Sequence, residues 1–349
     1  MSSQLGRRAF LRHGLTVGGL ALAAPAVLTA CVSGGDGDGS RYGIASQRLA
    51  WVKNTQFAGS YLADRNGYYV QEGFSGADLV SGGPTAPPIE SDVLSRTFTG
   101  VSQVPIVGSA VAKGAPLKII GAVYARNANC IMSMGASPIE TPQDLHGRTI
   151  GCSSSSEPVW RNFVAALGLD ASRITTVPVQ GDPIGMTTGE IDGYVGFVNN
   201  QVVDLRGKGF DIHAMLLADV GFPLVGQTYI TTQDVIDNDR EKVKAFLRAE
   251  IRGWKDVLAD PQYATDLTVN DYGRTLGLDP RTTLEACIAG NELIRTGEPG
   301  QRVIDISDAT VEANVRAIAA GGLDLSPDTL FDLGPIREVH REDPALALA

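Results

Sequence analysis

The most informative stretch of the chain runs Trp51-Val-Lys-Asn-Thr-Gln-Phe57-Ala-Gly-Ser-Tyr-Leu-Ala-Asp-Arg-Asn-Gly67-Tyr-Tyr-Val-Gln-Glu-Gly73. It predicts a first strand that ends at Trp51, a polar loop, and a helix that Gly67 closes. Tyr68 and Tyr69 are expected to pack this helix on the sheet. A strand followed by a helix that packs on the same sheet is the building unit of an α/β protein.

The same alternation of strand and helix continues toward the C-terminus. The helix at 241–258 is the clearest, because its apolar residues recur every three or four positions with charged residues between them. Asp279 and Ser307 are typical helix starts, and Gly321 is a typical stop. We expect strands at Leu117–Val123, Cys130–Met134, Thr149–Cys152, Gly193–Val198, Ile212–Leu217 and Thr228–Thr231, and helices at 156–168, 241–258, 280–294 and 308–320. This order predicts an α/β protein with largely parallel sheets.

The N-terminal segment has the features of an export signal. Arg7-Arg8 precedes an apolar run from Gly14 to Leu28, and the small residues Thr29-Ala30 precede Cys31. The cysteine resembles that of a bacterial lipobox, and the arginine pair resembles a twin-arginine signal. We therefore expect residues 1–30 to be a signal peptide, Cys31 to carry lipid, and residues 31–45 to form a flexible tether. A transmembrane anchor is the alternative, which the short, Pro25-interrupted apolar run disfavours.

Composition excludes several classes of protein. The net charge of −10 becomes −13 once residues 1–30 are removed, and an acidic chain of this kind argues against nucleic acid as a partner. Hydrophobic residues make up 43% of the chain, which is too few for a multi-span membrane protein. Cys130, Cys152 and Cys287 allow at most one disulfide, and three reduced thiols are an equal alternative. The chain has no CxxC and its four histidines are scattered, so we expect no metal and no cofactor.

Five segments of the chain resemble, in order, the solute-binding proteins that capture thiamine-pyrimidine precursors for ABC importers. Besides Trp51–Gly73 these are Thr99–Gln103, Gly151–Glu157, Gly189–Tyr194 and Phe197–Gln201, and the likeness extends over residues 47–260. Close relatives of that group resemble riboflavin-, sulfonate- and nitrate-binding proteins.

The resemblance implies a two-lobe periplasmic-binding-protein fold of type II, an α/β fold with the ligand in the cleft between the lobes. By analogy, lobe 1 comprises 46–128 and 228–325, lobe 2 comprises 129–227, and 326–349 is a C-terminal extension. It also implies a monomer on the outer face of the membrane whose partners are a small molecule and an ABC transporter permease. The position of the cleft agrees with the rule that ligands sit beyond the carboxyl ends of strands in open α/β sheets.

Four candidate ligand contacts lie on or beside the loop after the first strand. Trp51 is suited to stacking on a planar ring, although a core role is the alternative. Asn54 and Gln56 offer amides to ring nitrogens and carbonyls. At Phe57 the pyrimidine-binding relatives often have a histidine, which some related synthases use as a nitrogen donor. Phenylalanine cannot supply nitrogen, and we expect it to add a second apolar face to the pocket.

The other candidates lie at strand ends and one helix start. Glu157 argues against a sulfonate or nitrate ligand, because two negative charges would meet in a poorly solvated cleft. Each polar candidate has a plain alternative as a cap or an exposed turn. The set is Ser102, Gln103, Ser154, Ser155, Glu157, Tyr194, Phe197, Asn200, Gln227 and Tyr229.

These residues favour a binding protein over an enzyme. The chain has none of the common nucleophile, zinc or phosphate-loop motifs, and the matched cleft segments contain no histidine. The expected ligand is a neutral, planar nitrogen heterocycle such as a pyrimidine or a flavin-like ring. The alternatives are a sulfonate or nitrate receptor and a pyrimidine synthase-like enzyme, for which Cys152 is the one catalytic candidate that can be placed near the cleft.

Overall fold

The computed structural model describes residues 40–296 and 300–348. The expected signal peptide, the lipidation site Cys31 and most of the expected tether lie outside the described residues. Within the described ranges, no helix has both the length and the apolar composition that crossing a bilayer requires.

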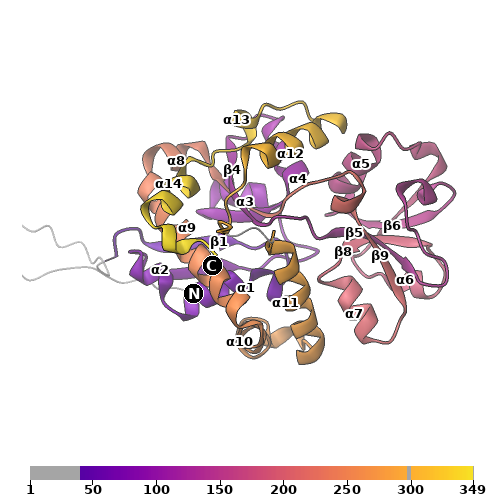
Figure 1. Cartoon of the computed structure of the whole chain (residues 1–349), viewed down its shortest axis with the longest axis horizontal. Coiled ribbons are helices and arrows are strands. Elements are labelled where there is room, and N and C mark those ends of the chain that lie inside the picture. The colour runs from indigo at the N-terminus through magenta and orange to yellow at the C-terminus, as the bar shows by residue number, and fades with distance from the viewer. Residues whose placement is uncertain (1–39, 297–299, 349) are drawn as a thin grey trace, which may run out of the picture. The chain divides into compact units, whose positions relative to one another are not determined.

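Two five-stranded sheets form the framework of the described part (Figure 1). The first sheet has the order β2-β1-β3-β10-β4 and defines lobe 1. The second has the order β7-β6-β8-β5-β9 and defines lobe 2. The strands are β1 (Ile44–Arg48), β2 (Gly76–Val80), β3 (Thr99–Ser102), β4 (Leu117–Tyr124), β5 (Asn129–Met134), β6 (Thr149–Ser153), β7 (Thr175–Val179), β8 (Gly193–Phe197), β9 (Ile212–Leu216) and β10 (Gly226–Thr232).

Both sheets are mixed: in each, four strands run in the same direction, as the prediction of largely parallel sheets requires, and one strand that was not predicted to be reversed runs against them. β1 runs parallel to β2 and β3, whereas β10 runs antiparallel to both of its neighbours, β3 and β4. In the second sheet β6 is parallel to β7 and β8, and β5 is antiparallel to β8 and β9. The antiparallel strands are the two that follow the crossings between lobes, where the chain enters the other sheet from the opposite direction.

The helices connect the strands and cover the sheets. The predicted helices are confirmed to within one or two residues, and the side chains of Asp279 and Ser307 accept the expected capping hydrogen bonds from backbone N–H groups. The helices are α1 (Ala58–Arg65), α2 (Tyr68–Gln71), α3 (Ile89–Ser95), α4 (Val104–Val111), α5 (Glu157–Ala166), α6 (Ile184–Thr187), α7 (Gln201–Gly207), α8 (Gln233–Asn238), α9 (Arg240–Ala259), α10 (Pro261–Leu267), α11 (Pro280–Ile294), α12 (Asp308–Ala320), α13 (Pro327–Leu330) and α14 (Gly334–Glu342).

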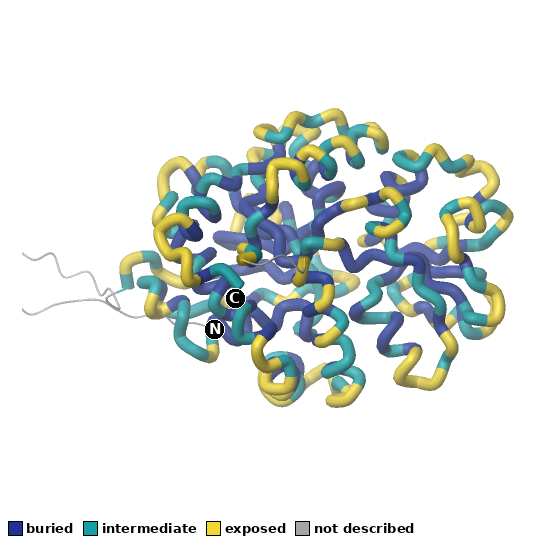
Figure 2. The backbone as a smooth tube through the Cα atoms, viewed as in Figure 1, coloured by how far each residue is buried: buried dark blue, intermediate teal, exposed yellow. Residues whose placement is uncertain are grey.

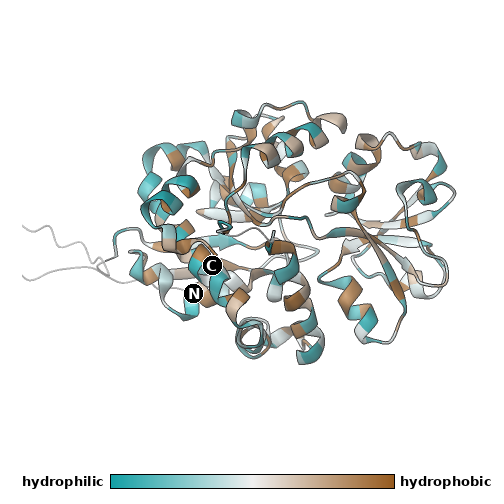
Figure 3. Ribbon diagram, viewed as in Figure 1, coloured by the Kyte–Doolittle hydropathy of each residue, from teal (hydrophilic) through white to brown (hydrophobic). Residues whose placement is uncertain are grey.

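The apolar residues lie along the strands and on the inner faces of the helices that cover them. The strands are mostly dark blue in Figure 2, and brown segments mark the same elements in Figure 3. On α9 the buried residues include Phe246, Ile251 and Trp254, as the apolar periodicity predicts. This core fixes the strand ends from which the loops of the site project.

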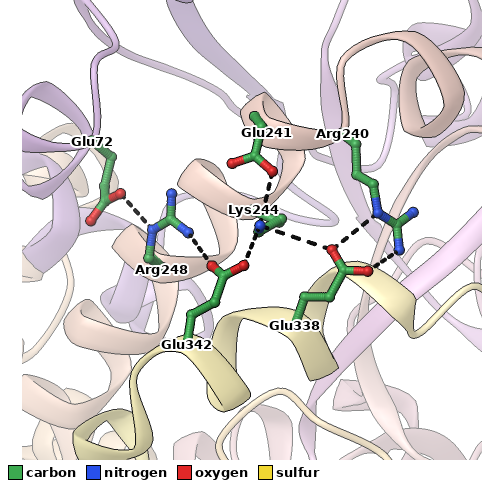
Figure 4. A network of polar contacts seen from close by, with 7 residues as sticks. All are labelled: Glu72, Arg240, Glu241, Lys244, Arg248, Glu338 and Glu342. Carbon is green, nitrogen blue, oxygen red and sulfur yellow. Dashed lines mark hydrogen bonds and ion pairs between the residues drawn. The ribbon is translucent and has the colours of Figure 1, made fainter.

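The C-terminal helix α14 packs on α9 through a network of ion pairs (Figure 4). Lys244 is almost fully buried and lies between Glu241, Glu338 and Glu342, at 2.9, 3.9 and 2.5 Å. Arg240 also contacts Glu338, at 2.7 Å. These contacts attach α14 to lobe 1.

The lobes are joined where the chain passes from β4 to β5 and returns from β9 to β10. Helix pairs also pack across them: α5 of lobe 2 lies against α12, and α7 lies against α11. The Asn162 amide of α5 donates a hydrogen bond to the backbone oxygen of Ile318 on α12, at 3.3 Å. The loops between these contacts enclose the candidate site.

Candidate functional site

A cavity lies between the two lobes, with an empty volume of about 830 Å³ that includes open solvent. Aromatic rings, amides and hydroxyls line it, and no lysine, arginine, histidine, aspartate or glutamate is among its described lining residues. These are Ala50, Trp51, Gln56, Ile89, Ser102, Gln103, Ile106, Tyr124, Asn127, Ala128, Ser153, Ser155, Ser156, Gly181, Tyr194, Phe197, Asn200, Gln201, Gly226 and Gln227.

Trp51 reaches from lobe 1 toward lobe 2. The strand β1 ends at Arg48, three residues earlier than expected, so Trp51 lies in the bend that follows. The backbone here passes so close to Gly82 that a Cβ on that residue would lie 2.7 Å from the Trp51 nitrogen. On the other side, a Cβ on Gly181 would lie 3.8 Å from the indole. Gly82 therefore allows two backbone segments of lobe 1 to approach closely, and the indole lies beside Gly181 of lobe 2.

Two glutamines connect the loop after Trp51 to the strand that returns to lobe 1. The side-chain amide of Gln227 donates a hydrogen bond to the backbone oxygen of Gln56 at 2.6 Å. Gln227 has a φ of 52°, in the left-handed region that side chains other than glycine rarely adopt. A strained backbone position of this kind is common at binding sites, where the surrounding structure enforces it.

Ser102 presents an acceptor to the cavity. Its hydroxyl donates a hydrogen bond to Glu90 Oε1 at 2.5 Å, so its proton is engaged and its lone pairs remain. The neighbouring Gln103 Oε1 is buried without a hydrogen-bond partner among the described residues. Both atoms can accept a hydrogen bond from a ligand N–H group.

Serine hydroxyls line the lobe 2 side at the start of α5. Ser153 Oγ lies 3.0 Å from Ser155 Oγ and donates to Ser156 Oγ at 3.1 Å. Ser156 occupies the N-cap position, but its side chain makes no capping hydrogen bond. These hydroxyls can both donate and accept hydrogen bonds.

The tyrosines of the site are neutral hydrogen-bonding groups. Burial raises the pKa of Tyr194 to about 12 and raises the pKa of Tyr124 well above its usual value. Tyr124 accepts a hydrogen bond from the Asn199 amide at 3.0 Å, which joins β4 of lobe 1 to the turn after β8 of lobe 2. The described residues of the wall are therefore uncharged at neutral pH.

Of the predicted site residues, most surround the two adjoining cavities. Ser154 and Glu157 line a second cavity that shares a wall with the first. The residues that line the first are Trp51, Gln56, Ser102, Gln103, Ser155, Tyr194, Phe197, Asn200 and Gln227.

Three predicted residues do not line either cavity. Asn54 Oδ1 accepts a hydrogen bond from the backbone N–H of Gln56, at 3.0 Å, and so caps the turn Thr55–Phe57. Phe57 is 1% exposed and belongs to the lobe 1 core rather than to a second pocket face. That turn is a 3₁₀-helix, in which consecutive side chains point in different directions, so Gln56 and Phe57 do not share a face.

Tyr229 is also buried in lobe 1. Its hydroxyl donates to Glu250 Oε2 at 2.6 Å and accepts from Trp254 Nε1 at 2.8 Å. The left-handed backbone at Gln227 interrupts the alternation of the strand, so Tyr229 does not follow Gln227 toward the cavity.

Several lining residues were not predicted from the sequence. Tyr124 and Asn127 lie at the first crossing between the lobes, and Gln201 begins α7. The rule that ligands lie beyond strand ends could have indicated Tyr124, the last residue of β4. Gly181 lies in a loop of lobe 2 and has no signal in the sequence, because its role depends on the approach of Trp51.

The Cys152 thiol and the described histidines are poorly placed for catalysis at this site. Burial raises the pKa of Cys152 to about 12, so its sulfur is a thiol rather than a nucleophilic thiolate at neutral pH. The described histidines line neither cavity. Among the described residues, no group of three or more His, Cys, Asp or Glu side chains is arranged to hold a metal ion.

The sequence model of one protein family, NMT1/THI5 like, matches residues 54–264. The chain belongs to this family. The match includes the loop after Trp51, the whole of lobe 2 and the strand β10, so the family covers most of the segments that form the cavity.

Curated relatives of the chain include binding proteins and a synthase. A riboflavin-binding protein, RibY, from Chloroflexus aurantiacus is 30% identical over 63% of this chain and 64% of its own length, so the match spans just under two thirds of that relative. A formylaminopyrimidine-binding protein from Halalkalibacterium halodurans is 26% identical over 70% of this chain and 75% of its own. A 4-amino-5-hydroxymethyl-2-methylpyrimidine phosphate synthase from Legionella pneumophila is 25% identical over 63% and 71%.

A solved structure shows the same fold. The alkanesulfonate-binding protein SsuA from Xanthomonas axonopodis pv. citri superimposes with a TM-score of 0.60 and 16% identity, over 81% of this chain and 95% of that one. The chain therefore has the expected α/β periplasmic-binding-protein fold.

Proposed function

We propose that the chain is an extracytoplasmic solute-binding protein that takes up a neutral, planar nitrogen heterocycle between its two lobes. The observation that carries the proposal is the wall of the first cavity, which combines the rings of Trp51, Tyr124, Tyr194 and Phe197 with amides and hydroxyls and has no charged side chain among its described residues. An uncharged ligand can bind against such a wall without leaving a buried charge unpaired.

The polar groups fit a heterocycle in particular. Ser102 and Gln103 offer acceptors for ring N–H or amino groups. The amides of Gln56 and Asn200 can form hydrogen bonds with ring nitrogens and carbonyls. Both a pyrimidine and a flavin-like ring have this combination of a flat face and a polar edge. Relatives named for riboflavin and for a formylaminopyrimidine support the same class of ligand.

We also propose that Cys31 anchors the protein by lipid to the outer face of the membrane and that an ABC importer receives the ligand. The arguments are the lipobox-like Leu28–Cys31, the twin-arginine-like pair Arg7-Arg8 and the Gly-, Ser- and Asp-rich segment that follows. The protein acts as a monomer in this account, because one chain supplies both walls of the cavity.

The alternative functions have less support. A sulfonate or nitrate would need a cation or several N–H donors in its site, and the first cavity offers no cation among its described residues. The synthase-named relative favours an enzyme as second candidate. Against it, Phe57 stands where some related synthases use a histidine as nitrogen donor, and burial keeps the Cys152 thiol protonated.

A thermal-shift screen of the mature chain against pyrimidines, riboflavin, purines and alkyl sulfonates tests the proposal. We expect at least one heterocycle to raise the melting temperature and to be recovered unchanged after incubation. Stabilisation by a sulfonate with none by a heterocycle would overturn the proposal, and chemical conversion of the bound heterocycle would favour the enzyme.

A further inference from the structure

A second cavity, with an empty volume of about 1580 Å³ that includes open solvent, adjoins the first. Trp51, Ile89, Ser153, Ser155 and Gly181 are among the residues that line both, so a ligand can extend from one into the other past the indole ring. The two differ in charge, because only the second has ionisable acids and a base among its described lining residues.

Glu90 is the central polar group of this second cavity. Its side chain lies at the start of α3 and the residue is 7% exposed. One carboxylate oxygen accepts the hydrogen bond from Ser102, at 2.5 Å, and among the described residues the other oxygen has no hydrogen bond or ion pair. That second oxygen is not among the fully buried atoms, so it is open to the cavity and can accept a hydrogen bond from a ligand donor.

Arg48, the one cation among the described residues that line the second cavity, is already engaged. The Arg48 guanidinium is 2.6 Å from Asp92 Oδ2, and it also donates to the backbone oxygens of Leu49 and Pro87, at 2.8 and 3.1 Å. It is therefore not free to neutralise an anion. Glu157 adds a second carboxylate and is only loosely paired with Arg161, at 3.5 Å.

We propose that the second cavity holds an uncharged, hydroxyl-bearing tail of the solute, that Glu90 accepts a hydrogen bond from it, and that Glu90 and Glu157 together exclude a phosphorylated tail. This inference rests on the proposed function, since the first cavity must hold the ring. It assigns to Glu90 a role in specificity that couples the cavities, because the same carboxylate orients Ser102 toward the ring.

The chemistry favours a hydroxyl over charged groups. A hydroxyl can donate to Glu90 and accept from Ser153, Ser154 or Ser155, which the same cavity provides. A phosphate has no proton to donate at its ionised oxygens and would meet two carboxylates in a partly desolvated space. Arg48 would compensate it little, because its charge is already paired with Asp92 and most of its donors are used.

The test uses two series of probes in which only the tail varies. One series is lumiflavin, riboflavin and riboflavin 5′-phosphate. The other is 4-amino-2,5-dimethylpyrimidine, its 5-hydroxymethyl analogue and the phosphate of that analogue. Binding is measured by titration calorimetry with the mature chain. Within the series that binds, we expect the affinity of the hydroxylated member to be about tenfold or more higher than that of its methyl and phosphate analogues, which is the scale of a hydrogen bond to a charged group.

Two variants and a matched control locate the effect. Glu90→Gln and Glu157→Gln are expected to reduce the preference for hydroxyl over phosphate several-fold. Glu312→Gln is the control and should leave this preference unchanged, because Glu312 lines neither cavity. Glu312 is otherwise matched to Glu157: each pairs with an arginine four residues later, at 3.5 Å. If Glu90→Gln does not fold, the wild-type series and Glu157→Gln still decide.

The outcomes separate the two proposals. Equal binding of the methyl, hydroxylated and phosphate members would overturn the tail inference and leave the proposed function standing. Failure of every member of both series to bind would overturn the proposed function for these ring classes and the inference with it.

Discussion

The amide of Gln227 and the backbone oxygen of Gln56 lie 2.6 Å apart, and this hydrogen bond joins the strand that returns from lobe 2 to the loop that carries Trp51. Gln227 holds the bond from a left-handed backbone, with a φ of 52°. This hydrogen bond is therefore made by a residue with a strained backbone, at a crossing between the lobes, in the wall of the cavity.

Replacement of Gln227 separates the strain from the hydrogen bond. Gln227→Ala keeps the unfavourable backbone and loses the amide, whereas Gln227→Gly also relieves the strain. We expect the glycine variant to be more stable than the alanine variant by about 0.5–1 kcal/mol, after the greater freedom of glycine in the unfolded chain is deducted. Urea denaturation of both variants measures this, and an alanine variant at least as stable as the glycine variant would contradict the expectation.

A buried carboxylate in lobe 1 gives a prediction for pH. Glu250 is fully buried and accepts hydrogen bonds from Ser60, Tyr69 and Tyr229, with no lysine or arginine paired to it among the described residues. Burial is the main cause that raises its pKa in the folded protein. The folded state then binds more protons than the unfolded state above the unfolded pKa of about 4.3, so this group's contribution to stability falls as pH rises.

Glu250→Gln removes that titration. We expect the difference in unfolding free energy, wild type minus variant, to decrease as pH rises from about 4 until the folded pKa is passed. Guanidinium denaturation at a series of pH values measures it. A difference that grows with pH would show that the folded pKa is lowered instead.

The ion-pair network of Figure 4 predicts that replacing Lys244, which belongs to it, lowers stability more than replacing Lys208, which lies outside it. Lys244 has a side chain that is 6% exposed and contacts three glutamates. Lys244→Met should lower the free energy of unfolding by about 1–3 kcal/mol. The loss is no larger because the three glutamates stay partly solvated. Lys208→Met, the control, breaks an exposed pair with Asp204 and should cost less than about 1 kcal/mol. Equal losses in chemical denaturation would rule out a special role for the network.

The proposed anchor depends on a single residue. Cys31→Ala should abolish lipid labelling and release the protein in a soluble form, because no other cysteine lies in the lipobox-like sequence. Ligand binding by the released protein should be unchanged. Membrane retention of the variant after detergent-free fractionation would argue for a different attachment.

The sequence predicts regular elements well because their signals are local. The apolar periodicity of α9 and the capping side chains of Asp279 and Ser307 need no information from the rest of the chain. Strand direction is different, since it depends on how the chain enters each sheet, and the antiparallel placement of β5 and β10 has no local signal.

The site is predictable only where a side chain follows from its own segment. Trp51 and Asn200 could be anticipated from the ends of strands, whereas Phe57 could not be placed because a 3₁₀ turn redirects it into the core. Glu90 belongs to the site through its hydrogen bond with Ser102 on the next strand, and Gly181 through its contact with Trp51 of the other lobe. Such long-range pairs are settled by tertiary packing.

The central claim is that a flat, uncharged ring stacks on Trp51 inside the first cavity. Titration calorimetry of wild type, Trp51→Phe and Trp51→Ala with the heterocycle that stabilises the protein most in the thermal-shift screen tests it directly. We expect Trp51→Ala to weaken binding by about 1–3 kcal/mol and Trp51→Phe to lose less, with the fold of both variants intact by circular dichroism. An affinity unchanged by Trp51→Ala would contradict the account, and unfolding of that variant would assign the indole to the core instead.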